Sequence, residues 1–176
     1  MTKSKVPPKV IVELNRQFNL ELDAAYAYFA LSIWCDARNL KGFGQYFVKQ
    51  GEEERKHAEK ILKHLSEREV TAQVAALAAP KQEFETLLEV AQQAQAHERA
   101  NTAGIYAVYE AAVADRDYPA QVLMHWFINE QVEEEAWAAE MIERIQAATC
   151  AGSLSSLDSH IERDLKKNVW ETPAAK

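Results

Sequence analysis

The chain has 176 residues, of which 48% are hydrophobic and 27% are charged, and its formal net charge is −7. This length suits one domain with a sizeable core, so we predict that residues 1–176 form a single domain. The negative charge argues against a nucleic-acid-binding protein, because such proteins neutralise phosphates with Lys and Arg.

Cysteine usage and hydropathy bear on location. Cys35 and Cys150 have no neighbouring Cys or His at the spacing of a zinc site, which favours reduced thiols. The first ten residues lack the apolar region of a signal peptide. No apolar run approaches the roughly 18 residues that cross a bilayer. We therefore expect a cytoplasmic protein with no membrane partner.

Gly and Pro are scarce, at five each, which favours an all-α fold. Pro7 and Pro8 suit the start of a first helix, and apolar residues recur from there at helical spacing to about Arg38. The glycines within residues 39–44 indicate a short turn. A second helix follows and fades near Glu69.

The middle of the chain predicts a long connection and then a third helix. Residues 71–82 contain Pro80 and lack a clear period, so we expect a crossover rather than a hairpin loop. Thr86 and Glu89 have the spacing of a capping box, which opens the third helix.

The last third of the chain predicts two more helices. Pro119 begins a fourth helix, and Gly152 is expected to end it as a C′ residue. Residues 153–167 predict a short fifth helix, and residues 168–176 a frayed tail. Residues 8–150 then form a four-helix bundle of two antiparallel hairpins joined by one long crossover.

Acidic residues interrupt the apolar stripe near the middle of each long helix. Unpaired buried carboxylates are very costly, so a cluster of them demands cations. The Glu54-x-x-His57 spacing places a carboxylate and an imidazole on one helical face. Oxygen-rich ligation with one imidazole suits iron or manganese. The candidate ligands are Glu21, Glu54, His57, Glu98 and Glu134.

With these residues in place, the chain resembles the ferritin family over about residues 8–167, and within it the bacterial non-haem ferritins. The resemblance implies a ferritin-like antiparallel four-helix bundle with one long crossover and a short fifth C-terminal helix. It rests on Asn19-Leu-Glu21-Leu with Tyr28, Glu53-Glu54-x-x-His57-Ala, His97-Glu98, and Asp117-Tyr-Pro119 followed by Trp126 and Glu130-Gln131-Val-Glu133-Glu134-Glu135.

The resemblance implies a di-iron centre. Glu21, Glu54 and His57 would hold the first iron, and a bridging Glu54 with Glu98 and Glu134 the second.

The resemblance also implies roles around these ligands. Tyr28 would be a redox-active tyrosine near the first iron, and Gln131 would orient water or an oxygen species beside the second. A third iron site would use Glu53, Glu130, Glu133 and Glu134.

The implied function is iron storage with ferroxidase activity, in which dioxygen or peroxide oxidises Fe(II) and ferric mineral collects in a homo-oligomeric cage, usually of 24 subunits. Bacterioferritins repeat Glu-x-x-His in the last bundle helix and carry a haem-ligating Met after the helix-two glutamate. Glu134 and Arg55 occupy these positions here, so we expect no haem.

Three alternatives share parts of this pattern. A soluble di-iron oxidase or rubrerythrin-like peroxidase has the bundle without a storage cage, but usually carries Glu-x-x-His twice or a Cys-rich domain. A DNA-protecting mini-ferritin often has a basic tail, for which Lys3, Lys5 and Lys9 are few. A metal-free helical bundle used for binding leaves the buried acids unexplained.

Overall fold

The computed structural model describes residues 6–166, and within that range the secondary structure is entirely helical. The all-α prediction is confirmed. No helix in this range is long and apolar enough to cross a membrane. The expected tail at 168–176 lies outside the described residues. The helices are α1 (Pro8–Asp36), α2 (Lys41–Glu67), α3 (Leu87–Ala114), α4 (Tyr118–Ala147) and α5 (Ala151–Lys166).

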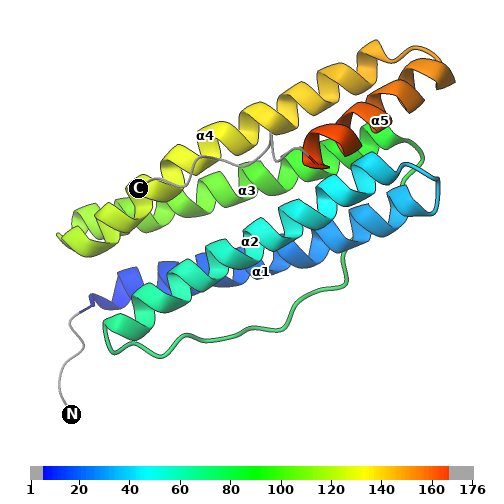
Figure 1. Ribbon diagram of the computed structural model, residues 1–176. Helices are drawn as coiled ribbons and strands as arrows, with labels where there is room; N and C mark the ends of the chain where they lie inside the picture. The colour runs from blue at the N-terminus through cyan, green and yellow to red at the C-terminus, as the bar shows by residue number, and fades with distance from the viewer. Residues whose placement is uncertain (1–5, 167–176) are drawn as a thin grey trace.

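The long helices form two antiparallel hairpins, α1 with α2 and α3 with α4, and the crossover between them runs along the first hairpin (Figure 1). Two apolar clusters fill the bundle. One includes Leu14, Ile61 and Phe127, and the other includes Phe47 and Val90. The positions between these clusters on each helix are those of the predicted acidic ligands.

The predicted helix starts at Thr86 and Pro119 are confirmed. The Glu89 amide donates to Thr86 Oγ1 at 3.2 Å. In return Glu89 Oε2 accepts from the amide of Glu85, one residue before the cap, at 3.0 Å. At α4, Pro119 lies in the first turn and Asp117 Oδ1 accepts from the Ala120 amide at 3.3 Å.

Two predicted boundaries were wrong, and both involve glycine. Helix α2 begins at Lys41, inside the range assigned to a turn, because Gly42 permits close packing and does not break the helix. Helix α4 ends at Ala147, and Gly152 lies in the first turn of α5. The start of α5 is held by Ser153 Oγ, which accepts from the Cys150 amide at 3.2 Å.

The long crossover is confirmed, and two asparagines of α1 hold it against the bundle. The Gln73 amide donates to Asn15 Oδ1 at 2.7 Å. Asn19 donates to the Gln73 carbonyl at 2.8 Å and accepts from the Ala75 amide at 2.7 Å. The crossover is therefore aligned with α1 by hydrogen bonds to its backbone.

Helix α5 folds back onto the N-terminal end of α2 (Figure 1). The buried Asp158 carboxylate accepts from the Phe43 amide at 3.0 Å. That amide is in the first turn of α2, where free N–H groups and the helix dipole favour an anion. A Cβ on Gly42 would lie 2.0 Å from the Asp158 carbonyl oxygen, so glycine is needed for this contact.

We predict that Gly42→Ala lowers the free energy of unfolding by about 1–3 kcal/mol, because the added methyl group overpacks the α2–α5 contact. The matched control is Gly152→Ala, whose Cβ would meet only Cys150 Sγ at 4.0 Å. It should be neutral or stabilising by up to about 1 kcal/mol. Urea unfolding of the two variants measures the difference. Equal stabilities would contradict the packing described for α5.

Candidate metal centre

Each long helix contributes one carboxylate to a polar layer between the two apolar clusters. Glu21 and Glu54 are fully buried, and Glu98 is 1% exposed. His57, one helical turn after Glu54, is 5% exposed, and Glu134 is partly buried. All five residues predicted as ligands therefore lie in this layer, and three of them, Glu21, Glu54 and His57, are close enough together to hold one ion.

The closest group is Glu21, Glu54 and His57, whose ligand atoms all lie within 4.8 Å of one another. His57 Nδ1 is 3.5 Å from Glu54 Oε2 and 3.8 Å from Glu21 Oε2. Within residues 6–166, Glu21 Oε2, Glu54 Oε1 and His57 Nδ1 are buried and have no hydrogen-bond partner. We call these three the unpaired ligand atoms. Each residue of this group thus has one atom without a hydrogen bond, which fits a metal ion because buried polar groups otherwise find partners.

The carboxylates of α3 and α4 are held by neutral donors. The Tyr28 hydroxyl donates to Glu98 Oε1. Gln131 Nε2 donates to Glu98 Oε2 at 3.3 Å and to the Glu98 carbonyl at 3.2 Å. Gln50 Nε2 donates to Glu134 Oε2 at 2.8 Å, which bridges α2 and α4.

Burial shifts three acids of this cluster toward their protonated forms. Burial raises the pKa of Glu54 well above its ordinary value, and the charges of Glu98 and Glu21 add to the shift. Burial also raises the pKa of Glu134 to about 8, with Glu98 and Glu53 contributing. The pKa of Glu98 is raised mainly by burial, against the hydrogen bond from Tyr28. A divalent cation would replace these protons.

For the imidazole of His57, the neighbouring carboxylates outweigh burial in setting the pKa. Burial would lower the pKa of His57, but its close contacts with the carboxylates of Glu21 and Glu54 raise that pKa well above its ordinary value. Burial likewise would raise the pKa of Glu21, whereas His57, Glu54 and Gln17 together bring it below its ordinary value. In the metal-free protein, His57 therefore serves as the counter-ion of Glu21.

Tyr28 and Gln131 lie at the second predicted metal position. Both are buried, and both donate to Glu98. Tyr28 is therefore hydrogen-bonded to a ligand that the resemblance assigns to the second iron, although its expected place was near the first. Gln131 also donates to Thr102 Oγ1 at 3.2 Å, and Thr102 donates to Glu135.

The three further acids of the expected third site lie at the edge of the cluster. Glu53 is partly buried and pairs with Lys49 at 3.6 Å. Glu130 is partly buried, and Glu133 is exposed. Burial raises the pKa of Glu130, which Lys60 and His57 oppose and Glu133 reinforces.

Two buried amides beside the ligands were not anticipated. Gln17 Nε2 donates to Glu21 Oε1 at 2.7 Å, and Asn101 Nδ2 donates to Glu54 Oε2 at 3.1 Å. The available signal was spacing, since Gln17 lies four residues before Glu21 and Asn101 three residues after Glu98. A polar residue one turn from a buried acid shares its face.

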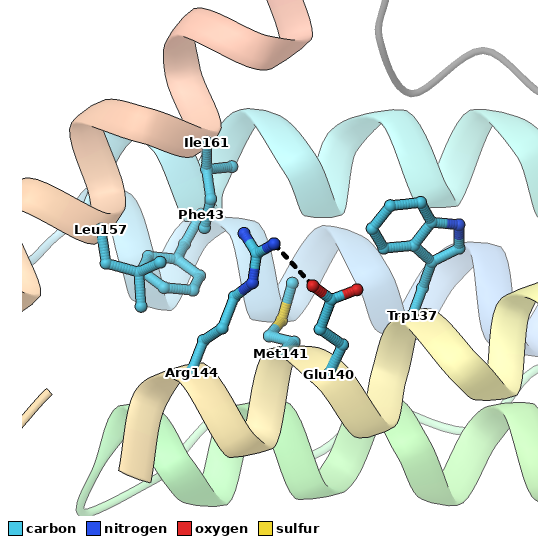
Figure 2. A pocket seen from close by; sticks show the side chains of 7 residues that line it. All are labelled: Phe43, Trp137, Glu140, Met141, Arg144, Leu157 and Ile161. Carbon is cyan, nitrogen blue, oxygen red and sulfur yellow. Dashed lines mark hydrogen bonds and ion pairs between the residues drawn. The ribbon is translucent and has the colours of Figure 1, made fainter. Parts of the chain in front are cut away.

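A separate cavity lies where α4 faces α5 and the start of α2 (Figure 2). Phe43, Met141, Leu157 and Ile161 give it an apolar lining, and Arg144 turns toward Glu140, its ion-pair partner. It includes none of the predicted ligands, so we do not assign the metal centre to it.

Comparison with known proteins agrees with this geometry. The model of the ferritin-like domain matches residues 11–148. A bacterial non-heme ferritin of Staphylococcus aureus strain MRSA252 is 39% identical over 123 residues, which is 70% of this chain and 74% of the relative. One from Staphylococcus epidermidis is 38% identical over 128 residues, or 73% and 77% of the two chains.

Solved structures give the same result. An open pore ferritin from the hyperthermophilic archaeon Archaeoglobus fulgidus superposes with a TM-score of 0.87 at 30% identity, covering 90% of this chain and 98% of the other. A form of that ferritin engineered to be closed gives 0.87 at 31% identity, covering 90% and 97%. The matched domain, the identities and the superposition together show that this chain belongs to the ferritin family.

Proposed function

We propose that this protein stores iron and is a ferroxidase, which oxidises Fe(II) at the buried carboxylate cluster and keeps the ferric product in an oligomeric cage. Membership of the ferritin family supports iron storage. The observation that carries the ferroxidase proposal is the close grouping of Glu21, Glu54 and His57 inside a buried acidic layer, where each residue has an atom without a hydrogen bond.

In this proposal, Glu21, Glu54 and His57 bind one ferrous ion, and Glu98 and Glu134 bind a second, with Glu54 between them. The carboxylates neutralise the two cations and favour Fe(III) over Fe(II), since anionic oxygen ligands stabilise the higher charge. Each ion gives one electron, so that the two together, with two protons, would reduce dioxygen to hydrogen peroxide or hydrogen peroxide to two molecules of water. Tyr28 and Gln131 orient Glu98 through their hydrogen bonds.

The edge acids Glu53, Glu130 and Glu133 are proposed as a third iron site that shares Glu134. The support is electrostatic, since the charge of Glu53 contributes to the raised pKa of Glu134 and that of Glu133 to the raised pKa of Glu130. Glu53 thus acts on Glu134 and Glu133 acts on Glu130, and in this proposal these acids receive iron that leaves the buried pair.

The competing function is a rubrerythrin-like oxidase or peroxidase without a cage. A second Glu-x-x-His is absent from the last bundle helix, because Gln131 and Glu134 stand at its glutamate and histidine positions. The oligomer mass separates the two functions.

We predict that the double variant Glu54→Ala with His57→Ala loses the rapid aerobic oxidation of about two Fe(II) per subunit, because both metal positions lose a ligand. Stopped-flow absorbance measures the initial rate. The matched control is Glu52→Ala with Arg55→Ala, an exposed pair on the same helix at the same spacing. A wild-type initial rate in the ligand variant would refute the site assignment.

We predict that metal binding at pH 7 releases protons, because Glu134 has a pKa of about 8 and must ionise to bind. Between the unfolded pKa of about 4.3 and this value, the folded apo protein binds more protons than the unfolded chain. The stability of the apo protein should therefore fall as pH rises through that window.

Anaerobic calorimetric titrations in buffers of different ionisation enthalpy count the released protons. Glu134→Gln should release fewer than the wild type, whereas Glu143→Gln, an exposed control on the same helix, should not differ from it. Proton release that Glu134→Gln leaves intact would contradict the role given to Glu134.

We predict that the protein purifies as a hollow oligomer many times heavier than the 19.9 kDa chain and without stoichiometric haem. The reason for the second part is that Arg55, an exposed cation, stands where bacterioferritins have a haem ligand. Analytical ultracentrifugation and the Soret absorbance test the two parts. A stable monomer would favour the oxidase alternative.

A further inference from the structure

The first metal position is flanked by two side-chain amides whose burial is complete. Gln17 on α1 and Asn101 on α3 are both 0% exposed, and these two helices pack against each other (Figure 1). Each amide donates one N–H to a ligand, Gln17 to Glu21 Oε1 at 2.7 Å and Asn101 to Glu54 Oε2 at 3.1 Å.

Each of these amides also has an unsatisfied oxygen. Among the residues that the structure describes, Gln17 Oε1 and Asn101 Oδ1 are buried and have no hydrogen-bond partner. A buried carbonyl without a donor destabilises a fold, whereas an apolar side chain of the same shape would not. Two such oxygens at one place therefore indicate a role other than stability.

The backbone of α3 is shaped around one of them. A Cβ on Gly104 would lie 1.8 Å from Gln17 Oε1, so any side chain at that position would displace the amide. Glycine in a helix interior costs stability relative to alanine. Gly104 thus keeps space for the Gln17 amide at the expense of helix stability.

We propose that Gln17 and Asn101 are positioning residues for the first metal ion, an inference that rests on the proposed function. Each holds one oxygen of Glu21 or Glu54. The other oxygens, Glu21 Oε2 and Glu54 Oε1, are left for the metal together with His57 Nδ1. The amide oxygens of Gln17 and Asn101 accept hydrogen bonds from water that enters with the hydrated cation.

For Gln17 the effect is specific to the first position, because Glu21 binds only that ion, whereas Asn101 holds Glu54, which the proposed function places between the two ions. Glu98 and Glu134 have other donors, namely Tyr28, Gln131 and Gln50. Loss of Gln17 leaves both of those carboxylates with the hydrogen bonds described above. A change confined to one of two bound ions therefore distinguishes positioning from general damage to the bundle.

Anaerobic titration with Co(II) tests this inference without iron oxidation. The variants Gln17→Met and Asn101→Leu keep most of the side-chain volume while removing the donor and the unsatisfied oxygen. We expect the affinity for the first Co(II) to fall about 10–100-fold, as for other residues that orient metal ligands. The visible bands of that ion should shift. In Gln17→Met the affinity for the second Co(II) should change much less, whereas Asn101→Leu should weaken both ions because Glu54 lies between them.

The matched control is Gln121→Leu, which removes a partly buried amide that donates to the Ala112 carbonyl at 3.0 Å, far along α4 from the ligands. It should lower the melting temperature of the apo protein and leave the cobalt spectrum unchanged. Gln17→Met and Asn101→Leu should change the cobalt spectrum and leave the melting temperature of the apo protein close to that of the wild type.

Variants that melt lower but bind the first Co(II) as the wild type does would show a merely structural role and overturn the inference. Gln17→Asn, which keeps the amide but is one methylene too short to reach Glu21, provides a second test if Gln17→Met does not fold. Its first-site affinity should fall too, and wild-type affinity would overturn the inference. A wild-type protein that binds no Co(II) at all would instead refute the proposed function.

Discussion

Burial of acidic groups in the middle of a four-helix core is the constraint on which the rest of this structure depends. Glu21, Glu54 and Glu98 are almost wholly inaccessible to water, so the bundle must replace the lost hydration. It does so with amides, a phenol and one imidazole, and the apolar core is divided into two clusters as a result. Even so, within residues 6–166 the donors do not satisfy every oxygen, and the unsatisfied atoms gather around the proposed first metal position.

Such a layer requires accurate alignment of four helices, because a slip of one residue moves a side chain by about 1.5 Å along a helix and by about 100° around it. The contacts of the crossover and of the helix starts serve this alignment. Asn15 and Asn19 hold the crossover on α1, and the Thr86 and Asp117 caps define where α3 and α4 start. The two caps lie far from the acids, whereas Asn19 is only two residues from Glu21.

Much of this arrangement could be predicted from the sequence, because a carboxylate in an apolar stripe conflicts with the helical period around it. That conflict is enough to identify Glu21, Glu54, Glu98 and Glu134. Gln17 and Asn101 could not be found in the same way. Neutral amides are common on helices, and their importance depends on contacts made with a neighbouring ligand. The helix boundaries near Gly42 and Gly152 were predicted wrongly for a related reason. In a sequence, a glycine that permits close packing or lies in the first turn of a helix cannot be told from a glycine that ends a helix.

The unsatisfied groups connect stability with function. A core optimised only for folding would place apolar side chains at the positions of Gln17, Asn101 and Glu54, since replacing buried polar groups by well-packed apolar ones is often stabilising. The chain keeps polar groups there, and keeps Gly104 beside them. A cation that binds the unpaired ligand atoms supplies the missing partner and removes the charge repulsion among the acids. Binding free energy then adds to folding free energy, so the layer that weakens the empty protein stabilises the loaded one.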